Sequence, residues 1–220
     1  MYLEREYGVI FNLKKIRRIM KLRGLMVKIR KRRQQFYYLK NTRHKTMPNR
    51  IKQKFNTNKS DRLYSTDITY MQYNGENRAF LSAIKDLGTK EIVHHRVAKN
   101  MDISLVTDGL SDFLKTIPQD KRKRMIMHSD QGSHYTSYFF RRILKLNGVK
   151  QSMSRRGNCL DNAPIESFFG HFKDESEYRS CKSFEELKKE VDKYINFYNN
   201  ERPQWGLKGK TPVEHRGLIS

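Results

Sequence analysis

Residues 63–97 read LYSTDITYMQYNGENRAFLSAIKDLGTKEIVHHRV, and this stretch decides the fold. Three runs rich in β-branched and aromatic residues, at about 63–71, 78–86 and 91–97, are separated by turn sequences at 73–76 and 88–90. Strands joined by connections this short pair with their neighbours in antiparallel fashion. The stretch therefore predicts a three-stranded antiparallel meander.

Helices and strands alternate after the meander. The apolar spacing predicts, in order, a helix at 103–115, a strand at 124–127, a helix at 137–146, a strand at 149–153, and helices at 161–175 and 183–200. Asp161 is expected to cap the helix that starts there, and Ser183 with Glu186 forms a capping box for the last one. The body is therefore predicted to be α/β, with three meander strands, two further strands and flanking helices.

Positive charge is concentrated in the N-terminal quarter of the 220-residue chain. Lys and Arg number 46 against 23 Asp and Glu, a formal net charge of +23. Residues 1–60 hold 19 of these basic groups and only two acidic ones, so this segment alone carries +17. An excess of this size predicts a polyanionic partner.

The basic segment 1–59 is predicted to be an arm that precedes a core domain at 60–216. Its apolar spacing indicates a short helix at about 12–23 with Asn12 as the cap, followed by a basic linker at 27–59 that contains aromatic residues. One interpretation is a solvated, disordered tail. The other, which the charge asymmetry favours, is an arm that follows phosphates and stacks its rings on bases. Its expected DNA contacts are Arg17, Arg18, Arg30, Lys31, Arg32 and Arg33.

Several classes of protein are disfavoured by composition. No apolar run reaches the roughly 18 residues of a membrane helix, and Glu4, Arg5 and Glu6 stand where a signal peptide is apolar. Two cysteines, Cys159 and Cys181, are too few for a disulfide framework. A cytoplasmic protein with no membrane association is the expectation.

Three carboxylates stand where chemistry is expected. Asp67 lies inside the first strand, Asp130 directly follows the fourth, and Glu166 lies in the first turns of the helix after Asp161. Each alone has an ordinary explanation: an edge-strand or capping residue, an Asx-turn former, and a surface helix charge. Together with a basic arm they favour phosphodiester chemistry, because hard divalent cations bind carboxylate oxygens and activate attacking and leaving oxygens.

Five strings carry a family resemblance: TDITY at 66–70, HSDQGSHYTS at 128–137, QSMSRRGNCLDNAPIESFF at 151–169, FYNNERP at 197–203 and TPVE at 211–214. With these strings the chain resembles the DDE transposases of bacterial insertion sequences, and in particular their second-reading-frame product, which shares the retroviral-integrase catalytic core. The resemblance covers about 60–216. It implies an RNase H-like fold with a five-stranded mixed sheet, and it makes the first 30 residues similar to a shortened helix-turn-helix.

The resemblance also implies roles for particular residues. Asp67, Asp130 and Glu166 would be the catalytic, metal-binding triad for two Mg²⁺ or Mn²⁺ ions, with 35 residues between the last two. The family's basic residue seven positions after the glutamate falls on Lys173. Further DNA contacts are expected at Arg155, Arg156 and Asn158. The implied partners are DNA at the element ends and target, further copies of the chain, and a subunit from an upstream reading frame, in a nucleoid-associated bacterial protein.

The function predicted from the sequence is transposition by metal-dependent DNA strand cleavage and strand transfer. The alternative is an inactive or truncated DNA-binding remnant that regulates or competes with a full transposase. A structural RNA-binding protein fits the charge but leaves the three carboxylates unexplained. A tyrosine recombinase has little support, because Tyr194 and Tyr198 share the apolar face of the last helix.

Other conspicuous side chains have mostly structural interpretations. The pair His94–His95 is expected to place one ring in the core and one in solvent, whereas His128 either orients a water or phosphate or is structural. Cys159 is expected to be a small loop or buried residue without nucleophilic function. Trp205, with Pro203, is expected to close the terminal helix against the body.

Overall fold

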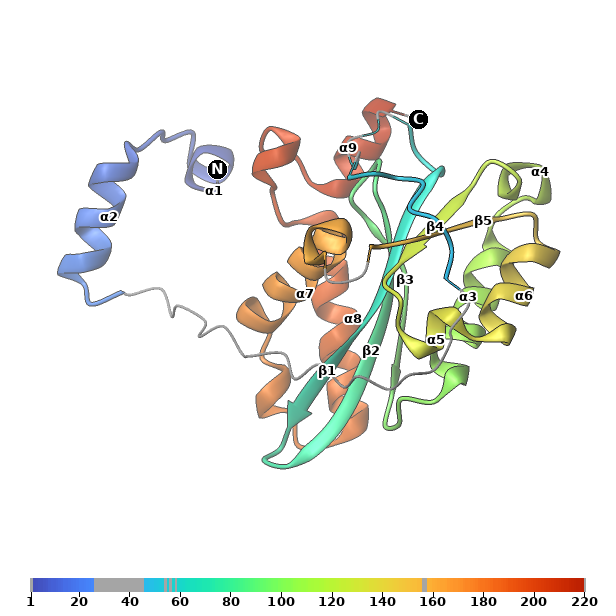
Figure 1. Ribbon diagram of the computed structural model, residues 1–220. Coiled ribbons are helices and arrows are strands. Elements are labelled where there is room, and N and C mark those ends of the chain that lie inside the picture. The colour runs from blue at the N-terminus through green and yellow to red at the C-terminus, as the bar shows by residue number, and fades with distance from the viewer. Residues whose placement is uncertain are drawn as a thin grey trace. The chain divides into compact units, whose positions relative to one another are not determined.

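A computed structural model describes residues 2–25, 46–53, 55, 57, 59–155 and 158–219 (Figure 1). The chain divides into two compact units, Met1–Arg43 and His44–Ser220. The described residues between 46 and 59 belong to the second unit, and some of them bond to it directly. The functional division into an arm at 1–59 and a catalytic core at 60–216 stays a prediction.

The first unit contains two helices, α1 (Tyr2–Tyr7) and α2 (Leu13–Leu22). The helix expected at 12–23 is present, and the Asn12 side chain accepts a hydrogen bond from the Lys14 amide at 2.9 Å. Arg17 and Arg18 are exposed on α2. The predicted contacts at 30–33 lie outside the described residues.

The second unit is built on one five-stranded mixed sheet. Its strands are β1 (Leu63–Tyr73), β2 (Asn77–Asp86), β3 (Ile92–Ala98), β4 (Ile126–Ser129) and β5 (Lys150–Met153), in the order β3-β2-β1-β4-β5. The first three pair antiparallel, whereas β4 pairs parallel to both β1 and β5. The predicted meander and the two added strands are confirmed.

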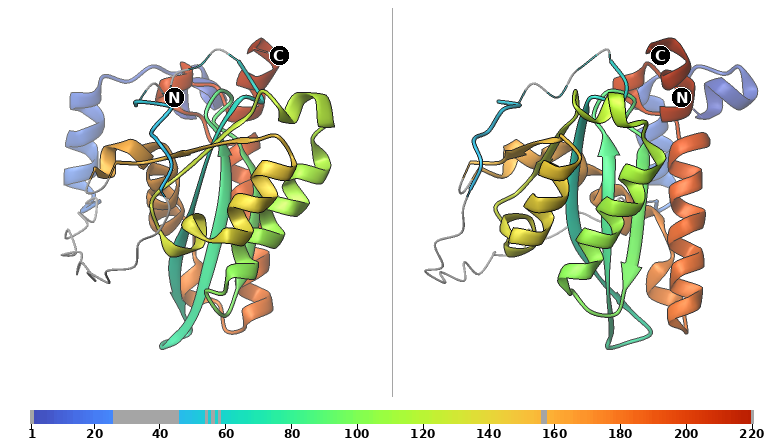
Figure 2. Two further views of the ribbon diagram at one scale, coloured as in Figure 1. Left: turned by 45° about the vertical axis from the view of Figure 1, so that its right-hand side comes forward. Right: turned by 90° about the vertical axis from the view of Figure 1, so that its right-hand side faces the viewer.

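Helices cover both faces of this sheet (Figures 1 and 2). One face carries α3 (Ile103–Thr116), α5 (Ser133–Thr136) and α6 (Tyr138–Leu146), with α4 (Gln119–Arg122) beside them. The other carries α7 (Ala163–Glu175) and α8 (Phe184–Asn200). The chain ends with α9 (Pro212–Ile219), and 3-10 turns occupy 159–162, 178–180 and 205–207. None of the described helices combines the length and apolarity that a membrane span requires.

Successive side chains of β1 point to opposite faces of the sheet, and the core accordingly consists of two apolar clusters, one on each face. Met71 and Tyr73 pack with α7 and α8, whereas Tyr64 packs with α3 and α6 on the opposite face. The capping box of α8 is confirmed in part, since the Glu186 amide donates to Ser183 Oγ at 3.1 Å, whereas the Glu186 carboxylate accepts from the amide at position 182.

The sequence analysis missed α1, α4, α5 and α9, which span four to eight residues each. Segments this short show too little of a helical period to be recognised. The expectation for Trp205 is wrong, because its side chain is 75% exposed on the turn at 205–207. Leu207, at 5% exposed, is the residue of this turn that packs against the body.

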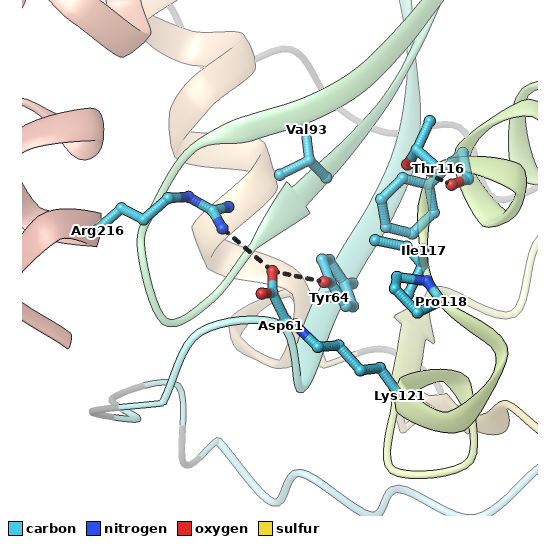
Figure 3. A pocket seen from close by; sticks show the side chains of 9 residues that line it. Asp61, Tyr64, Val93, Thr116, Ile117, Pro118, Lys121 and Arg216 are labelled. Atoms are coloured by element: carbon cyan, nitrogen blue, oxygen red, sulfur yellow. Dashed lines mark hydrogen bonds and ion pairs between the residues drawn. The ribbon is translucent and has the colours of Figure 1, made fainter. Parts of the chain in front are cut away.

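The last helix packs against α8 and is also tied to the body through one arginine. Arg216 of α9 donates to Glu91 at 2.6 Å and to Asp61 at 3.2 Å, and lies 4.0 Å from buried Asp86. Figure 3 shows Arg216 and Asp61 at the edge of a cavity of about 280 Å³, where Asp61 also accepts from the Tyr64 hydroxyl. One guanidinium therefore ties α9 to β1 and to the turn between β2 and β3.

Arg216→Ala is expected to lower the free energy of unfolding by about 3 kcal/mol, because Glu91 and Asp86 are buried and would lose their countercharge. For a chain of this size the melting temperature should fall by about 6–12 °C. Thermal denaturation checks this, with Arg216→Lys as the control that keeps the charge but loses the forked geometry. A melting temperature within a degree of wild type for Arg216→Ala would contradict it.

Candidate active site

Asp67 lies in the middle of the longest strand. Its side chain points to the same face of β1 as Met71, the face covered by α7 and α8, because the three odd-numbered positions from 67 to 71 share one side. The carboxylate is half-buried and accepts the Ile68 amide at 2.8 Å. An acid at a core-facing position is costly unless charge or hydrogen bonds compensate it.

The register of β1 and β4 brings Asp130 beside Asp67. Ser65 pairs with His128 in this parallel ladder, and each aspartate follows its member of the pair by two residues. Adjacent strands lie about 4.8 Å apart, so the two carboxylates start from neighbouring backbone positions. Asp130 accepts the Gly132 amide at 2.9 Å, and a Cβ on Gly132 would lie only 2.9 Å from the same carboxylate oxygen. Glycine is therefore required there.

Glu166 reaches this end of the sheet from α7, which packs against β1 (Figure 1). It is exposed in the first turn of the helix, and Lys173 follows two turns later on the same face. Pro164 occupies the first turn, where a missing amide proton costs no helical hydrogen bond. The proline is thus compatible with a helix that presents Glu166.

The charges of these groups influence one another. The pKa of Asp67 is raised to about 8, first by desolvation and then by the negative charge of Asp130. Glu166 raises it further, whereas the Ile68 amide and Lys173 lower it. The pKa of Glu166 is itself raised, first by the partial desolvation of its carboxylate beside the sheet and then by the charge of Asp130. Three acids that repel one another in this way form a site of concentrated negative potential.

The donor set suits a hard divalent cation. All three groups are carboxylates, which Mg²⁺ and Mn²⁺ prefer, and their mutual repulsion is what a bound cation would relieve. Within the described ranges, however, no three His, Cys, Asp or Glu side chains lie close enough to form a ready-made metal site. The residues fit such an ion in chemistry, and their assignment as ligands is a proposal taken up below.

The loop before α7 is held by Asp161, which does not cap the helix as expected. Its fully buried carboxylate accepts from the Arg155 amide at 2.9 Å, from the Arg155 guanidinium at 3.0 and 3.1 Å, and from Asn49 and Gln53 at 2.9 and 2.8 Å. Because these donors surround its carboxylate, Asp161 points into the protein and does not cap the helix. The predicted linker residues 49 and 53 thus brace the loop that leads to Glu166.

The network at Asp161 predicts an acid-sensitive stability contribution. Hydrogen bonds from Arg155 hold the pKa of Asp161 well below its usual value, so the charged form favours folding above about pH 4 and this contribution is lost as the pH falls. We expect Asp161→Asn to cost about 1–2 kcal/mol at pH 7. Chemical denaturation at pH 7 and pH 3 checks the sign: an unchanged difference between wild type and variant at both values would contradict it.

Sequence reasoning missed Lys85, a buried lysine on β2. Its ammonium donates to the Pro164 carbonyl at 3.0 Å and to the Tyr198 hydroxyl at 2.9 Å, and lies 5.4 Å from the Tyr198 ring centre. Lys85 is 5% exposed, and it holds the start of α7 two residues before Glu166. The available signal was a lysine at the end of the mostly apolar run AFLSAIK at 79–85.

The remaining candidates fall into three groups. The Asn158 side chain accepts a hydrogen bond from the Leu160 amide at 3.2 Å and so caps a 3-10 turn. The Arg155 guanidinium binds Asp161. The DNA contacts expected of Asn158, Arg155 and Lys173 stay predictions. Arg156 lies outside the described residues. Asn162, 3% exposed, leaves both side-chain atoms without a partner in the described structure.

The histidines and tyrosines are mainly structural. His128 is fully buried between Ser152 Oγ at 2.9 Å and Ser154 Oγ at 3.2 Å, and burial lowers its pKa, so the structural interpretation holds for it. His95 is bonded to Asp192 at 2.7 Å. Tyr194 and Tyr198 are buried in the core, as expected. The side chain of Cys159 is not among those described.

Comparisons with known proteins agree with this fold. Two family models, both described as integrase core domain, match residues 57–159 and 166–218. An uncharacterized transposase-like protein of Haemophilus influenzae is 35% identical over 93% of each chain. The putative transposase InsK for insertion sequence element IS150 of Escherichia coli is 35% identical over 95% of this chain and 72% of that protein.

Solved structures show the same architecture at low sequence identity. The HTLV-2 integrase catalytic core domain in complex with magnesium superimposes with a TM-score of 0.51 and 16% identity, over 71% of this chain and 96% of that one. A chain of the simian T-cell lymphotropic virus intasome gives 0.56 and 15%, over 80% of this chain and 60% of that one. The predicted RNase H-like fold is confirmed. By its family matches and its sequence identity to these relatives, the chain belongs to the insertion-sequence transposases with an integrase core domain.

Proposed function

We propose that this chain catalyses metal-dependent DNA strand cleavage and strand transfer, with Asp67, Asp130 and Glu166 as the catalytic carboxylates. The observation that carries the proposal is the placement of Asp67 and Asp130 on adjacent parallel strands, with Glu166 on the helix that packs against β1. Burial, and then the charge of Asp130, raises the pKa of Asp67 to about 8. Membership of a transposase family supports it. The 35 residues between Asp130 and Glu166 match the spacing of the resemblance.

Each carboxylate has a defined support within the fold. Asp67 and Asp130 start from adjacent strands, and Glu166 extends from a helix whose first turn Lys85 and Asp161 hold in place. Two divalent cations bound by these oxygens would supply Lewis-acid activation of the attacking oxygen and stabilise the leaving oxygen. The protein's part is to hold the three acids aligned against their own repulsion, which favours protonation of Asp67 until cations bind.

The reaction needs no covalent protein intermediate. In the first step, water attacks the phosphodiester at the element end, the bridging P–O3′ bond breaks, and a free 3′-hydroxyl is released. In the second step, that hydroxyl attacks a target phosphodiester, joins the strands, and releases a target 3′-hydroxyl. Both steps exchange one P–O bond for another, so no external energy source is required.

DNA is the proposed partner of the basic groups. Lys173, two turns from Glu166 on the same face of α7, is placed to contact a phosphate near the reacting bond, and Arg17 and Arg18 expose positive charge on α2. Titles of structural neighbours name an intasome and dimeric and trimeric forms. We extend the same expectation to this chain: copies assemble on DNA, with an upstream-frame subunit as a further partner.

The proposal predicts that alanine at any one of the three carboxylates abolishes cleavage and leaves DNA binding nearly unchanged. Loss of one catalytic acid should reduce the rate by at least about a thousandfold, since no other described group replaces its oxygens. A gel assay of labelled element-end DNA measures the products, with exposed Asp120→Ala on α4 as the control. Metal-dependent strand transfer by Asp130→Ala would refute the assignment.

A further inference from the structure

Three exposed side chains gather at the start of α6. Tyr138 and Phe139 are 60% and 62% exposed, and their rings meet edge to face with centres 5.8 Å apart. One turn later, Arg142 donates to the Tyr138 hydroxyl at 3.2 Å, with its guanidinium 5.8 Å from the centre of that ring. We call these three residues the α6 patch. Two adjacent large rings in solvent are unusual in a soluble domain and mark an interaction site.

The rings are held in place by the structure below them. On the opposite side of the same helix, Phe140 and Leu144 are each 1% exposed in the core, and Ser137 Oγ caps the helix by accepting the Phe140 amide at 3.2 Å. The position of the α6 patch is thus fixed by an anchored helix. A partner that binds these rings would need little further ordering of the protein.

The topology places the α6 patch at the Asp130 end of the sheet, on the face opposite α7 and α8. Because β4 and β5 run parallel, the chain between them must return from the end of β4 to the beginning of β5. Asp130 immediately follows β4, α5 begins three residues later, and α6 makes the return (Figure 1). Tyr138 and Phe139 therefore lie on the Asp130 side, whereas Lys145 and Leu146 lie toward the opposite end.

The charge around the α6 patch identifies the kind of partner. Arg142 is exposed beside the two rings, and no Asp or Glu occurs in the sequence between Asp130 and Asp161. Aromatic rings beside cations are the combination that binds single-stranded nucleic acid, since every base has a face on which a ring can stack. The bases inside a duplex are already stacked, so exposed rings select bases that are not paired.

We propose that the α6 patch binds unpaired nucleotides of the DNA strand next to the cleavage site, with Tyr138 and Phe139 stacking on bases and Arg142 binding a phosphate. This inference rests on the proposed function, because it takes DNA as the substrate at the Asp130 end. It adds a surface that lies outside the five sequence strings on which the family resemblance rests. The two rings act as positioning groups for DNA and take no part in the chemistry.

The test measures DNA binding in EDTA, so that no cleavage is needed. Fluorescence anisotropy compares a blunt duplex with one of the same sequence that ends in a short single-stranded overhang. Wild type is expected to bind the overhang duplex more tightly, and Tyr138→Ala/Phe139→Ala to bind it about tenfold more weakly while binding the blunt duplex as wild type does. Arg142→Ala should weaken overhang binding and reduce its salt dependence.

The matched control is Lys145→Ala/Leu146→Ala, which removes an exposed cation and an exposed apolar side chain from the far end of the same helix and should leave both affinities unchanged. Unchanged overhang binding in the Tyr138→Ala/Phe139→Ala variant overturns the inference. So does a loss of self-association in sedimentation velocity without DNA, which would assign the rings to contacts between protein copies. If wild type shows overhang binding that depends on the rings but yields no cleavage with Mg²⁺, the inference stands and the proposed activity fails.

Discussion

Asp67→Asn is expected to melt at a higher temperature than wild type in EDTA while forming no cleavage product. The wild-type carboxylate is desolvated and repelled by Asp130 and Glu166, which raises its pKa to about 8. A neutral amide of the same shape removes that repulsion. The gain should be at least about 1 kcal/mol at pH 8, a rise of about 2–4 °C in melting temperature.

The pH dependence of this gain follows from the sign of the shift. An acid whose folded pKa lies above its unfolded value of about 4 stabilises the fold in its protonated form, and that contribution is lost as the pH rises through about 8. The stability difference between Asp67→Asn and wild type should therefore be small below about pH 4, grow steadily between about pH 4 and pH 8, and level off above about pH 8. Scanning calorimetry across this range in EDTA measures it.

Added Mg²⁺ or Mn²⁺ should reverse the order, because a cation stabilises wild type through Asp67 and has less to bind in the variant. Asp120→Asn, an exposed carboxylate on α4, is the control and should respond to neither pH nor metal. If Asp67→Asn melts below wild type at pH 8 in EDTA, Asp67 is not the repelled acid of a metal site. That result would favour a purely structural role on β1.

Lys85→Met is expected to reduce strand cleavage by about 10–100-fold and to raise the Mg²⁺ concentration needed for half-maximal rate, because outer partners that orient a ligand have effects of this size. The ammonium ties the Pro164 carbonyl to β2, and Glu166 follows two residues later. Methionine fills a similar volume, and replacing a buried charge by an apolar side chain is often neutral for folding. Stability should therefore change much less than metal dependence.

Tyr198→Phe is the matched control for Lys85→Met. It removes the second acceptor of the Lys85 ammonium but leaves the bond to Pro164, so its metal titration should stay close to that of wild type. Hydrogen exchange of the amides at 163–168 should increase in Lys85→Met only. If the cleavage rate of Lys85→Met depends on Mg²⁺ concentration as that of wild type does, Lys85 does not help to position Glu166.

The long elements were predictable from sequence because their patterns are local. The meander from Leu63 to Ala98 has alternating and β-branched residues with turn residues between them, and α8 has a helical period with a capping box at Ser183. The parallel pairing of β4 with β1 was not predicted, since no local signal in four residues reports which strand lies beside them, and the resemblance implied only a mixed sheet. Sheet order is a tertiary property, set by which apolar faces pack together.

The sequence pointed to the three carboxylates of the candidate site, but it did not reveal the side chains that hold the surrounding loop and helix in place. Asp67 stands out as a charge inside a strand, and the quoted strings of the resemblance mark Asp67, Asp130 and Glu166 together. Asp161 has a capping sequence, yet its partners Asn49 and Gln53 come from more than 100 residues away, so the sequence pattern gave the wrong role. Likewise, the partners of Lys85 are a carbonyl and a hydroxyl from two distant helices, which composition does not report.

The measurement that tests the central claim most directly is strand cleavage and joining on DNA that ends in the element's terminal repeats, with Mg²⁺ or Mn²⁺, for wild type and Glu166→Gln. Glutamine keeps the shape of the side chain but not its charge. The account predicts metal-dependent products from wild type and none from Glu166→Gln, with equal DNA binding by both. Equal DNA binding without products from either protein would contradict activity of this chain alone and would point to a DNA-binding remnant or to a chain that needs its upstream-frame partner.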